Sequence, residues 1–199
     1  MNTLNAAAVL AGGKSTRMGF DKQELLVDGE QLTARLIRAL RQDFETVVVV
    51  TARPELYQDL EVETISDIYP GKGPLAGIHA ALRFTEAEHV YVTACDMPNY
   101  DPRMSALLRS IIVEHKPDAC VTRQGEWFEF FHAAYGRSAL PLLETILEGD
   151  IPSVGTFLRG ISTYYLPEQD VRMISPDWGL FRNLNTPHDH QEYLSSIVK

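Results

Sequence analysis

The sequence contains few cysteines, no long apolar run and no excess of positive charge, and each of these absences excludes a class of protein. Cys95 and Cys120 are the two cysteines, which is too few for a disulfide framework and fits buried free thiols in a reducing compartment. No apolar run approaches the roughly 20 residues of a membrane helix. The N-terminus lacks the basic and apolar regions of a signal peptide. The net charge of −9 argues against a general nucleic-acid binder. We therefore expect a cytoplasmic protein that binds neither membrane nor nucleic acid.

What is present is the composition of a globular protein. The chain has 199 residues, of which 45% are hydrophobic and 23% charged, which is sufficient for one sizeable core. We find no repeat, low-complexity tract or linker, so we expect a single domain over residues 1–199.

Strand-like and helix-like segments alternate through the first half of the chain. β-Branched and apolar runs predict strands, and apolar residues at helical spacing predict helices. The strands are expected at 6–10, 46–51, 62–65 and 89–94, and the helices at 31–43, 76–83 and 104–114. This alternation predicts an α/β fold of the Rossmann-like type, with a mostly parallel sheet and helices on both faces.

The second half of the chain is less regular. Strands are expected at 119–122 and 128–135, joined by a turn, which predicts a short antiparallel excursion. A helix is expected at 140–147, and further short strands at 161–166 and 173–174. Thr186 and Pro187 at the first positions, with an acidic residue at N3, predict that the last helix starts there.

The segment that follows the first predicted strand carries glycines and cations together. Residues 10–22 read LAGGKSTRMGFDK. Adjacent glycines let backbone N–H groups approach an anion closely, and the cations add full positive charge. The Walker pattern and the G-x-G-x-x-G pattern do not fit the segment. We interpret it as a phosphate loop of another kind, one that binds a nucleoside triphosphate.

Two acidic residues lie where predicted strands end. Asp96 follows the strand at 89–94 and precedes a Met-Pro turn, and Asp67 follows the strand at 62–65. In parallel sheets ligands bind beyond the carboxyl ends of the strands, where these side chains meet the loop at 12–22. Carboxylates suit Mg²⁺ that also contacts substrate phosphates. The alternative is that each Asp caps a turn or a helix.

A second glycine-rich segment offers a rival interpretation. Residues 71–77 read GKGPLAG, and Asp96 follows at about the offset of a dinucleotide-binding fold. Residues 67–70 separate these glycines from their strand, however, and Pro74 removes one donor N–H. We therefore expect a loop that closes over a base or ribose. His132, beside two phenylalanines, is expected to be a hydrogen-bonded, partly buried residue and not a ligand or a base. The aromatic run 127–131 belongs either to the core or to the lining of a substrate pocket.

These motifs in this order resemble a known family. The segment 10–22 resembles the signature of nucleotidyltransferases that couple a nucleoside triphosphate to a phosphorylated acceptor. GPLAG at 73–77, CDMP at 95–98 and FRNLNTP at 181–187 are similar to those of the molybdenum cofactor guanylyltransferases, over nearly the whole chain. The resemblance implies GTP, Mg²⁺ and molybdopterin (molybdenum cofactor) as ligands. It would add molybdenum-insertion proteins and apo-molybdoenzymes as partners.

The resemblance also implies roles for individual residues. The nucleotide-binding residues would be Leu10, Ala11, Gly12, Gly13, Lys22, Asp67 and Asp96. The catalytic residues would be Arg17, Lys22 and Asp96, with Asp96 as the metal ligand. Asn183 and Asn185 would contact the acceptor.

The chain departs from the family pattern at two places. Thr51 and its two successors stand where the family has an Asn, and residues 129–133 replace a proline-containing segment. Three alternatives stay open: a related transferase that uses CTP with molybdopterin or a nucleoside triphosphate with a sugar phosphate, a dinucleotide-dependent oxidoreductase, and a nucleotide-binding adaptor without catalytic activity.

Overall fold

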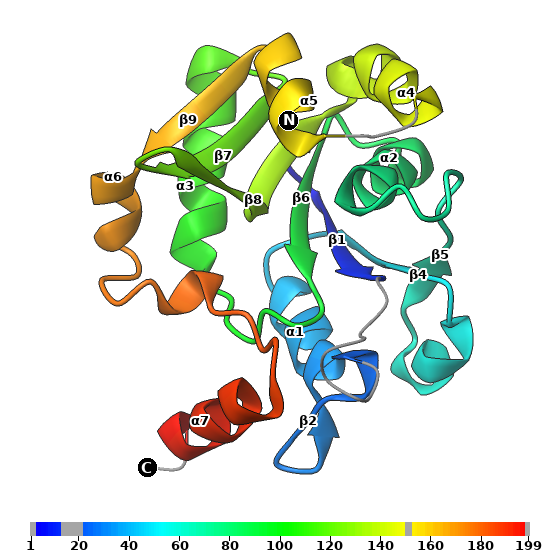
Figure 1. Cartoon of the computed structure of the whole chain (residues 1–199), viewed down its shortest axis with the longest axis vertical. Coiled ribbons are helices and arrows are strands. Elements are labelled where there is room, and N and C mark those ends of the chain that lie inside the picture. Colours follow the sequence, from blue (N-terminus) through cyan, green and yellow to red (C-terminus); the bar gives the residue numbers. More distant parts are fainter. Residues whose placement is uncertain (1–2, 13–21, 150–152, 198–199) are drawn as a thin grey trace.

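A seven-stranded sheet forms the centre of the computed structural model, which describes residues 3–12, 22–149 and 153–197 (Figure 1). Its strands are β1 (Ala6–Ala11), β4 (Thr46–Thr51), β5 (Glu63–Ile65), β6 (His89–Ala94), β7 (Ala119–Gln124), β8 (Trp127–Gly136) and β9 (Thr163–Pro167). The helices are α1 (Leu32–Leu40), α2 (Pro74–Thr85), α3 (Pro102–His115), α4 (Leu140–Glu148), α5 (Val154–Gly160), α6 (Glu168–Arg172) and α7 (Pro187–Ile197). Strands β2 (Leu26–Val27) and β3 (Glu30–Gln31) form a separate antiparallel pair.

The strand order is β5-β4-β1-β6-β8-β7-β9. Strands β1, β4, β5 and β6 are mutually parallel, and β9 is parallel to β7. Strand β8 runs antiparallel to both of its neighbours, β6 and β7. The predicted mostly parallel sheet with an antiparallel excursion is therefore confirmed.

Alternating side chains of the central strands pack into two separate cores. In β1, Ala7 and Val9 belong to the core on one face, which α1 and α3 complete. Ala8 and Leu10 belong to the core on the other face, which α2, α4 and α5 complete. Because both faces are covered, the strands are apolar throughout, as the runs at 46–51 and 89–94 predict. Burial of each such Val or Leu side chain contributes about 1.5–3 kcal/mol.

Some predicted elements differ from the observed ones. The short strand expected at 173–174 is wrong, because these residues form the end of α6 and the turn after it, where Ile174 N donates to Val171 O. Helix α5 was not expected, since it is short and has a glycine at its second position, although Ser153 caps it. His132 is hydrogen-bonded as expected, with its Nδ1 2.6 Å from the Tyr91 hydroxyl, but it is fully buried and not partly buried.

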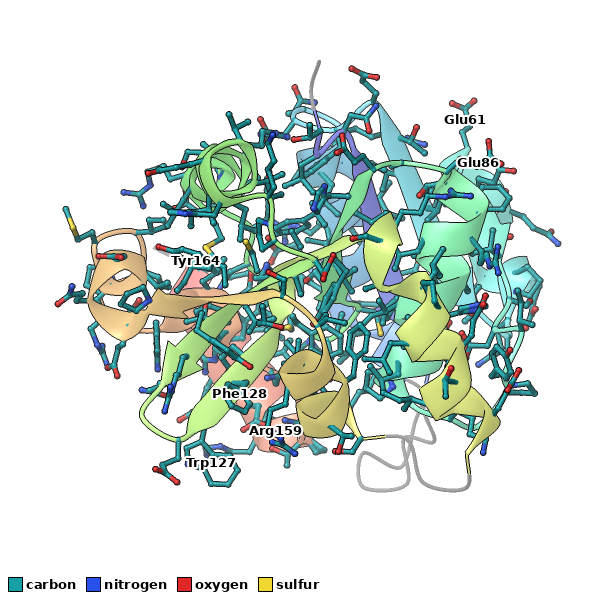
Figure 2. All side chains as sticks on the ribbon, turned by 90° about the horizontal axis from the view of Figure 1, so that it is seen from above. Glu61, Glu86, Trp127, Phe128, Arg159 and Tyr164 are labelled. Carbon is teal, nitrogen blue, oxygen red and sulfur yellow. The ribbon has the colours of Figure 1, made fainter. Side chains whose placement is uncertain are left out.

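The aromatic residues of the β7–β8 hairpin differ in their exposure to solvent. Trp127 is 78% exposed and points outward at the end of the hairpin (Figure 2). Phe128 is half-buried, with its ring 5.3 Å from that of Tyr165 on β9. Trp127 is therefore a surface residue, whereas Phe128 and Phe131 are partly buried and pack against the core.

The order in which strands are added to the sheet reverses between β1 and β6, which are themselves parallel. After β1 it continues to β4 and β5 on one side, and it then returns to place β6 on the other side of β1. At the carboxyl ends of this pair, Cys95 N donates to Leu10 O at 3.1 Å. Such a reversal is where open α/β sheets bind ligands. The region beyond the carboxyl ends of β1 and β6 is therefore the candidate site.

Candidate functional site

Three residues from distant parts of the chain meet beyond the ends of β1 and β6. The Lys22 ammonium lies 2.6 Å from Asp96 Oδ2 and 2.6 Å from Asn185 Oδ1. The side chains of Lys22 and Asp96 are 24% and 13% exposed, so the ion pair is mostly shielded from water. All three were expected to be site residues, and the structure brings them into direct contact.

Asp96 reaches the carboxyl end of the sheet because strand β6 ends two residues before it. The six residues of β6 are all buried, and Met97 N then donates back to Ala94 O at 3.1 Å to form a turn. Cys95 and Met97, on either side of Asp96, point into the core with 5% and 0% exposure. The turn leaves the Asp96 side chain outside that core, 13% exposed and in contact with the Lys22 ammonium.

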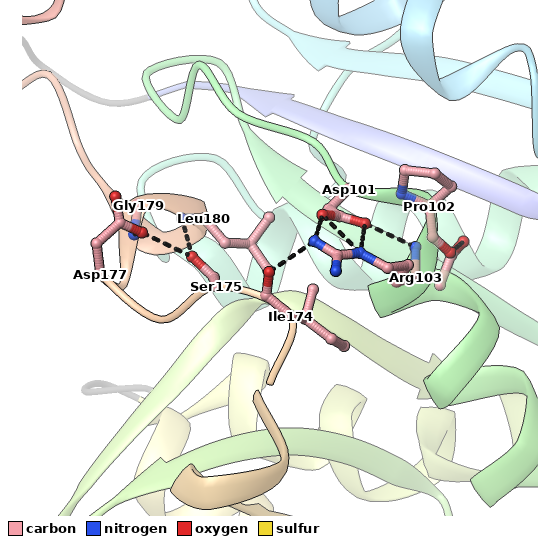
Figure 3. A network of polar contacts seen from close by, with 9 residues as sticks. Asp101, Pro102, Arg103, Ile174, Ser175, Asp177, Gly179 and Leu180 are labelled. Carbon is pink, nitrogen blue, oxygen red and sulfur yellow. Dashed lines mark hydrogen bonds and ion pairs between the residues drawn. The ribbon is translucent and has the colours of Figure 1, made fainter. Parts of the chain in front are cut away.

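The C-terminal segment is fastened to the loop that follows Asp96 (Figure 3). Arg103, at the start of α3, pairs with Asp101 and also donates from Nη2 to Ile174 O at 2.7 Å. Asn99 Nδ2 donates to Gly179 O at 2.6 Å. These contacts lead residues 174–181 along the 96–101 loop and direct the following residues toward Asp96.

Asn185 is held in place by the start of the last helix. Asp189 Oδ2 accepts from Asn185 N at 2.9 Å and from Thr186 N at 2.8 Å, and Asp189 N donates to Thr186 Oγ1. The predicted capping arrangement is therefore confirmed. Leu184 is fully buried and its N donates to Asp96 O at 2.9 Å. Asn183 instead turns its amide back onto its own chain, where Nδ2 donates to Phe181 O.

Leu184 also belongs to a small core that links the two ends of the chain. This core contains Leu25, Val27, Leu32, Leu184 and Tyr193. It packs the β2–β3 unit, next to Lys22, against the C-terminal segment, next to Asn185. Burial of this apolar surface therefore brings Lys22 and Asn185 close enough to form their hydrogen bond.

Asp67 lies at the same end of the sheet but outside this cluster. It follows β5, and the described residues offer neither a hydrogen bond nor an ion pair that joins it to Asp96. Burial raises the pKa of Asp67, and the nearby His79 opposes this shift. Its Oδ1 is buried without a hydrogen-bond partner among the described residues. A polar ligand group could satisfy this atom.

The end of β1 and the start of α2 approach each other closely. Leu10 is 8% exposed and Ala11 is buried, whereas Gly12 is exposed. A Cβ added to Gly77 of α2 would lie 2.8 Å from Leu10 Cδ1, so the glycine permits this approach. Gly73, the N-cap of α2, has φ 71° and ψ −156°, a conformation that favours glycine. Gly13 and Arg17, expected to face the phosphates, lie outside the described residues.

Sequence reasoning missed Gln23, which follows Lys22. Gln23 is 6% exposed, and its Oε1 accepts from Thr51 Oγ1 at 2.7 Å and from Tyr57 OH at 3.1 Å. Its backbone oxygen accepts from Gln31 Nε2 at 2.7 Å. Thr51 and Tyr57 lie 28 and 34 residues away in the chain, so no local sequence pattern predicts their contact with Gln23.

The oxygen atoms around the Lys22 ammonium are suitable for a metal ion. A carboxylate of Asp96 and an amide oxygen of Asn185 converge on one positive charge at 2.6 Å each. Mg²⁺ prefers hard oxygen donors of this kind and completes its coordination with substrate phosphates and water. The residues present therefore fit the metal that the resemblance implies.

A mostly parallel sheet with a lysine–carboxylate pair at the point where its strand order reverses is typical of an α/β enzyme that binds phosphorylated ligands. The chain belongs to the MobA-like NTP transferase domain family, whose model matches residues 7–161. It is a nucleotidyltransferase by this membership.

Relatives and solved structures agree with the family. The chain is 40% identical to a probable molybdenum cofactor guanylyltransferase of Peptoclostridium acidaminophilum, over 94% of this chain and 87% of that protein. It is also 40% identical to the molybdenum cofactor guanylyltransferase of Syntrophotalea carbinolica, over 94% and 90%. The crystal structure of molybdopterin-guanine dinucleotide biosynthesis protein A from Archaeoglobus fulgidus is similar with a TM-score of 0.84 and 29% identity, over 96% and 97%. In the described part of the chain, no helix is both long and apolar enough to cross a membrane.

Proposed function

We propose that this chain transfers GMP from GTP to the terminal phosphate of molybdopterin or the molybdenum cofactor, releasing pyrophosphate. The observation that carries the proposal is the contact of Lys22, Asp96 and Asn185 at the reversal of the sheet. It joins a residue of the expected nucleotide side to one of the expected acceptor side. The names of the two relatives at 40% identity support GTP and the molybdenum cofactor as substrates.

The reaction needs positioning and charge neutralisation more than a strong base. The acceptor phosphate is already ionised, so one of its oxygens can form a bond to the α-phosphorus of GTP. The bond between the α-phosphorus and the bridging oxygen breaks, and pyrophosphate leaves with the electron pair. Groups that hold the two phosphates in line supply most of the acceleration in such a transfer.

Each site residue then has a proposed role. Leu10, Ala11 and Gly12 would contact the guanine, and Gly13 and Arg17 the phosphates. Asp67 would lie near the ribose or the metal. Lys22 would exchange its contact with Asp96 for one with the departing phosphates. Asn183 and Asn185 would contact the acceptor. Asp96 would hold Mg²⁺, which when bound neutralises phosphate charge.

The wider setting of the enzyme belongs to the same proposal. We expect a single nucleotidyltransferase domain over residues 1–199, working in the cytoplasm without nucleic acid or membrane. Molybdenum-insertion proteins and apo-molybdoenzymes are the expected partners, because the product must be delivered to an enzyme that uses it.

A pyrophosphate-release assay tests the proposal. With Mg²⁺, GTP and molybdopterin together should release pyrophosphate, and either substrate alone should not. CTP, ATP and UTP in place of GTP, and a sugar phosphate in place of molybdopterin, measure the alternatives. Activity only with CTP or only with a sugar phosphate would contradict the proposal. GTP binding without pyrophosphate release would indicate an adaptor, and NAD binding an oxidoreductase.

A further inference from the structure

We propose that Gln23 is a positioning residue that fixes Lys22 in the transferase site. This inference rests on the proposed function, in which Lys22 acts on the nucleotide phosphates. It adds a residue to that site which neither the motifs nor the resemblance assigns a role. The long, flexible side chain of Lys22 must be held in one position if its charge is to act on the phosphates.

Lys22 carries its charge on a side chain that loses substantial rotamer freedom when it is fixed. Its ammonium nevertheless lies 2.6 Å from both Asp96 and Asn185. A catalytic charge must stay within about 0.5 Å of its productive position. The backbone from which the side chain extends must therefore be fixed as well.

Among the described residues, Gln23 is the member of the short η1 turn (Lys22–Glu24) whose side chain is buried against the end of the central sheet. Leu25 N donates to Lys22 O at 3.3 Å, which is a long hydrogen bond. The Gln23 side chain, by contrast, is buried, and its Oε1 accepts from Thr51 at 2.7 Å and from Tyr57 at 3.1 Å. A buried amide oxygen with two hydroxyl donors has one favourable position, because losing either donor costs an unsatisfied polar group.

The two donors come from parts of the protein that are themselves rigid. Thr51 is the last residue of β4 and is 3% exposed, and its Oγ1 also accepts from Arg53 N at 2.9 Å. Tyr57 lies in η2 (Pro54–Leu60) and is 1% exposed. These two hydrogen bonds hold Gln23, and with it the adjacent backbone of Lys22, in a fixed position relative to the central sheet.

This assignment explains the departure from the family pattern at the end of β4. Thr51 stands where the resemblance leads us to expect an asparagine on the nucleotide. The structure turns its hydroxyl toward Gln23 instead. Thr51 therefore contributes to the site through Lys22 and not through its own contact with the ligand.

Tyr57→Phe and Tyr135→Phe form a matched pair of tests. Each removes one hydroxyl from a tyrosine with at most 1% exposure. Tyr57 donates to Gln23, whereas Tyr135 donates to Phe130 O at 2.7 Å, on β8. We expect Tyr57→Phe to lower kcat by about 3- to 10-fold, with KM for GTP changed by less than about 2-fold. Tyr135→Phe should leave both constants within about 2-fold.

Gln23→Met supplies the stronger test, because it keeps the shape and removes the acceptor. In the otherwise native protein, kcat should fall by about 10- to 100-fold. In a Lys22→Ala background the same change should cost less than about 2-fold, because a positioning residue has nothing left to position. Thermal melts show whether each variant is folded.

Three results would overturn the inference. The first is an equal loss from Gln23→Met with and without Lys22. The second is an equal loss of kcat in Tyr57→Phe and Tyr135→Phe. This comparison also tests the inference if Gln23→Met does not fold. The third is a loss confined to KM. Failure of the proposed function is distinguishable, because the native protein would then release no pyrophosphate from GTP and molybdopterin.

Discussion

Replacing Lys22 by methionine should strengthen the binding of a divalent metal in the absence of nucleotide. The ammonium lies 2.6 Å from Asp96 Oδ2, so a metal that binds this carboxylate must displace it. Methionine keeps the length and apolar stem of lysine and removes the charge. Turnover should change in the opposite direction, because the same charge is proposed to stabilise the departing pyrophosphate.

The size of the effect follows from the ion pair. Two unit charges about 4 Å apart attract by about 4 kcal/mol at an effective dielectric constant of about 20. Desolvation and lost side-chain freedom reduce the net value, which we take as about 1–2 kcal/mol for a pair 24% and 13% exposed. Removal of this competition should tighten metal binding by about 5- to 30-fold. Loss of the charge should lower kcat by about 10²–10³-fold.

Mn²⁺ titration followed by electron paramagnetic resonance measures free metal directly, without nucleotide or turnover. Arg38→Met is the matched control, because it removes the same charge from an exposed pair between Arg38 of α1 and Glu30 of β3, which includes none of the site residues. Arg38→Met should leave the Mn²⁺ affinity unchanged, and Asp96→Asn should abolish the binding. If Lys22→Met binds Mn²⁺ no more tightly than the native protein, the ammonium does not occupy the metal position and the reasoning fails.

Three further predictions follow from the same structure. Asp96→Ala should lose nearly all pyrophosphate release and keep its circular dichroism spectrum; normal turnover in the folded variant would remove the metal assignment. Gly77→Ala should raise KM for GTP severalfold with stability changed by no more than about 1 kcal/mol, because the new Cβ, 2.8 Å from Leu10 Cδ1, must displace that side chain while alanine favours the helix; an unchanged KM argues against Leu10 at the base. Burial lowers the pKa of His132 to about 3. The unfolded chain therefore takes up a proton near pH 6.5 that the native protein does not, so stability is full above about pH 6.5 and falls by up to about 1.4 kcal/mol per unit as the pH decreases toward about 3. Urea melts at about pH 7 and about pH 4.5 should show a smaller loss for His132→Gln than for the native chain, and equal losses would refute this account.

Periodicity was sufficient to predict most of the fold. The strands at 46–51 and 89–94 have the predicted bounds. Runs of apolar and β-branched residues favour extended backbone, and a strand in the middle of the sheet buries their side chains on both faces. Short elements such as α5 and the β2–β3 pair were missed. They are stabilised by contacts with distant parts of the chain, which a local pattern does not record.

The candidate site divides in the same way. The sequence by itself determined that Lys22 follows a glycine-rich segment, that Asp96 follows a buried strand and that Asn185 precedes a helix cap, because each is a local consequence of neighbouring residues. Only the tertiary structure decided that these three side chains converge on one point and that Gln23 is attached to Thr51 and Tyr57. The physical reason is that the reversal of the strand order and the small core around Leu184 bring together segments separated by more than a hundred residues.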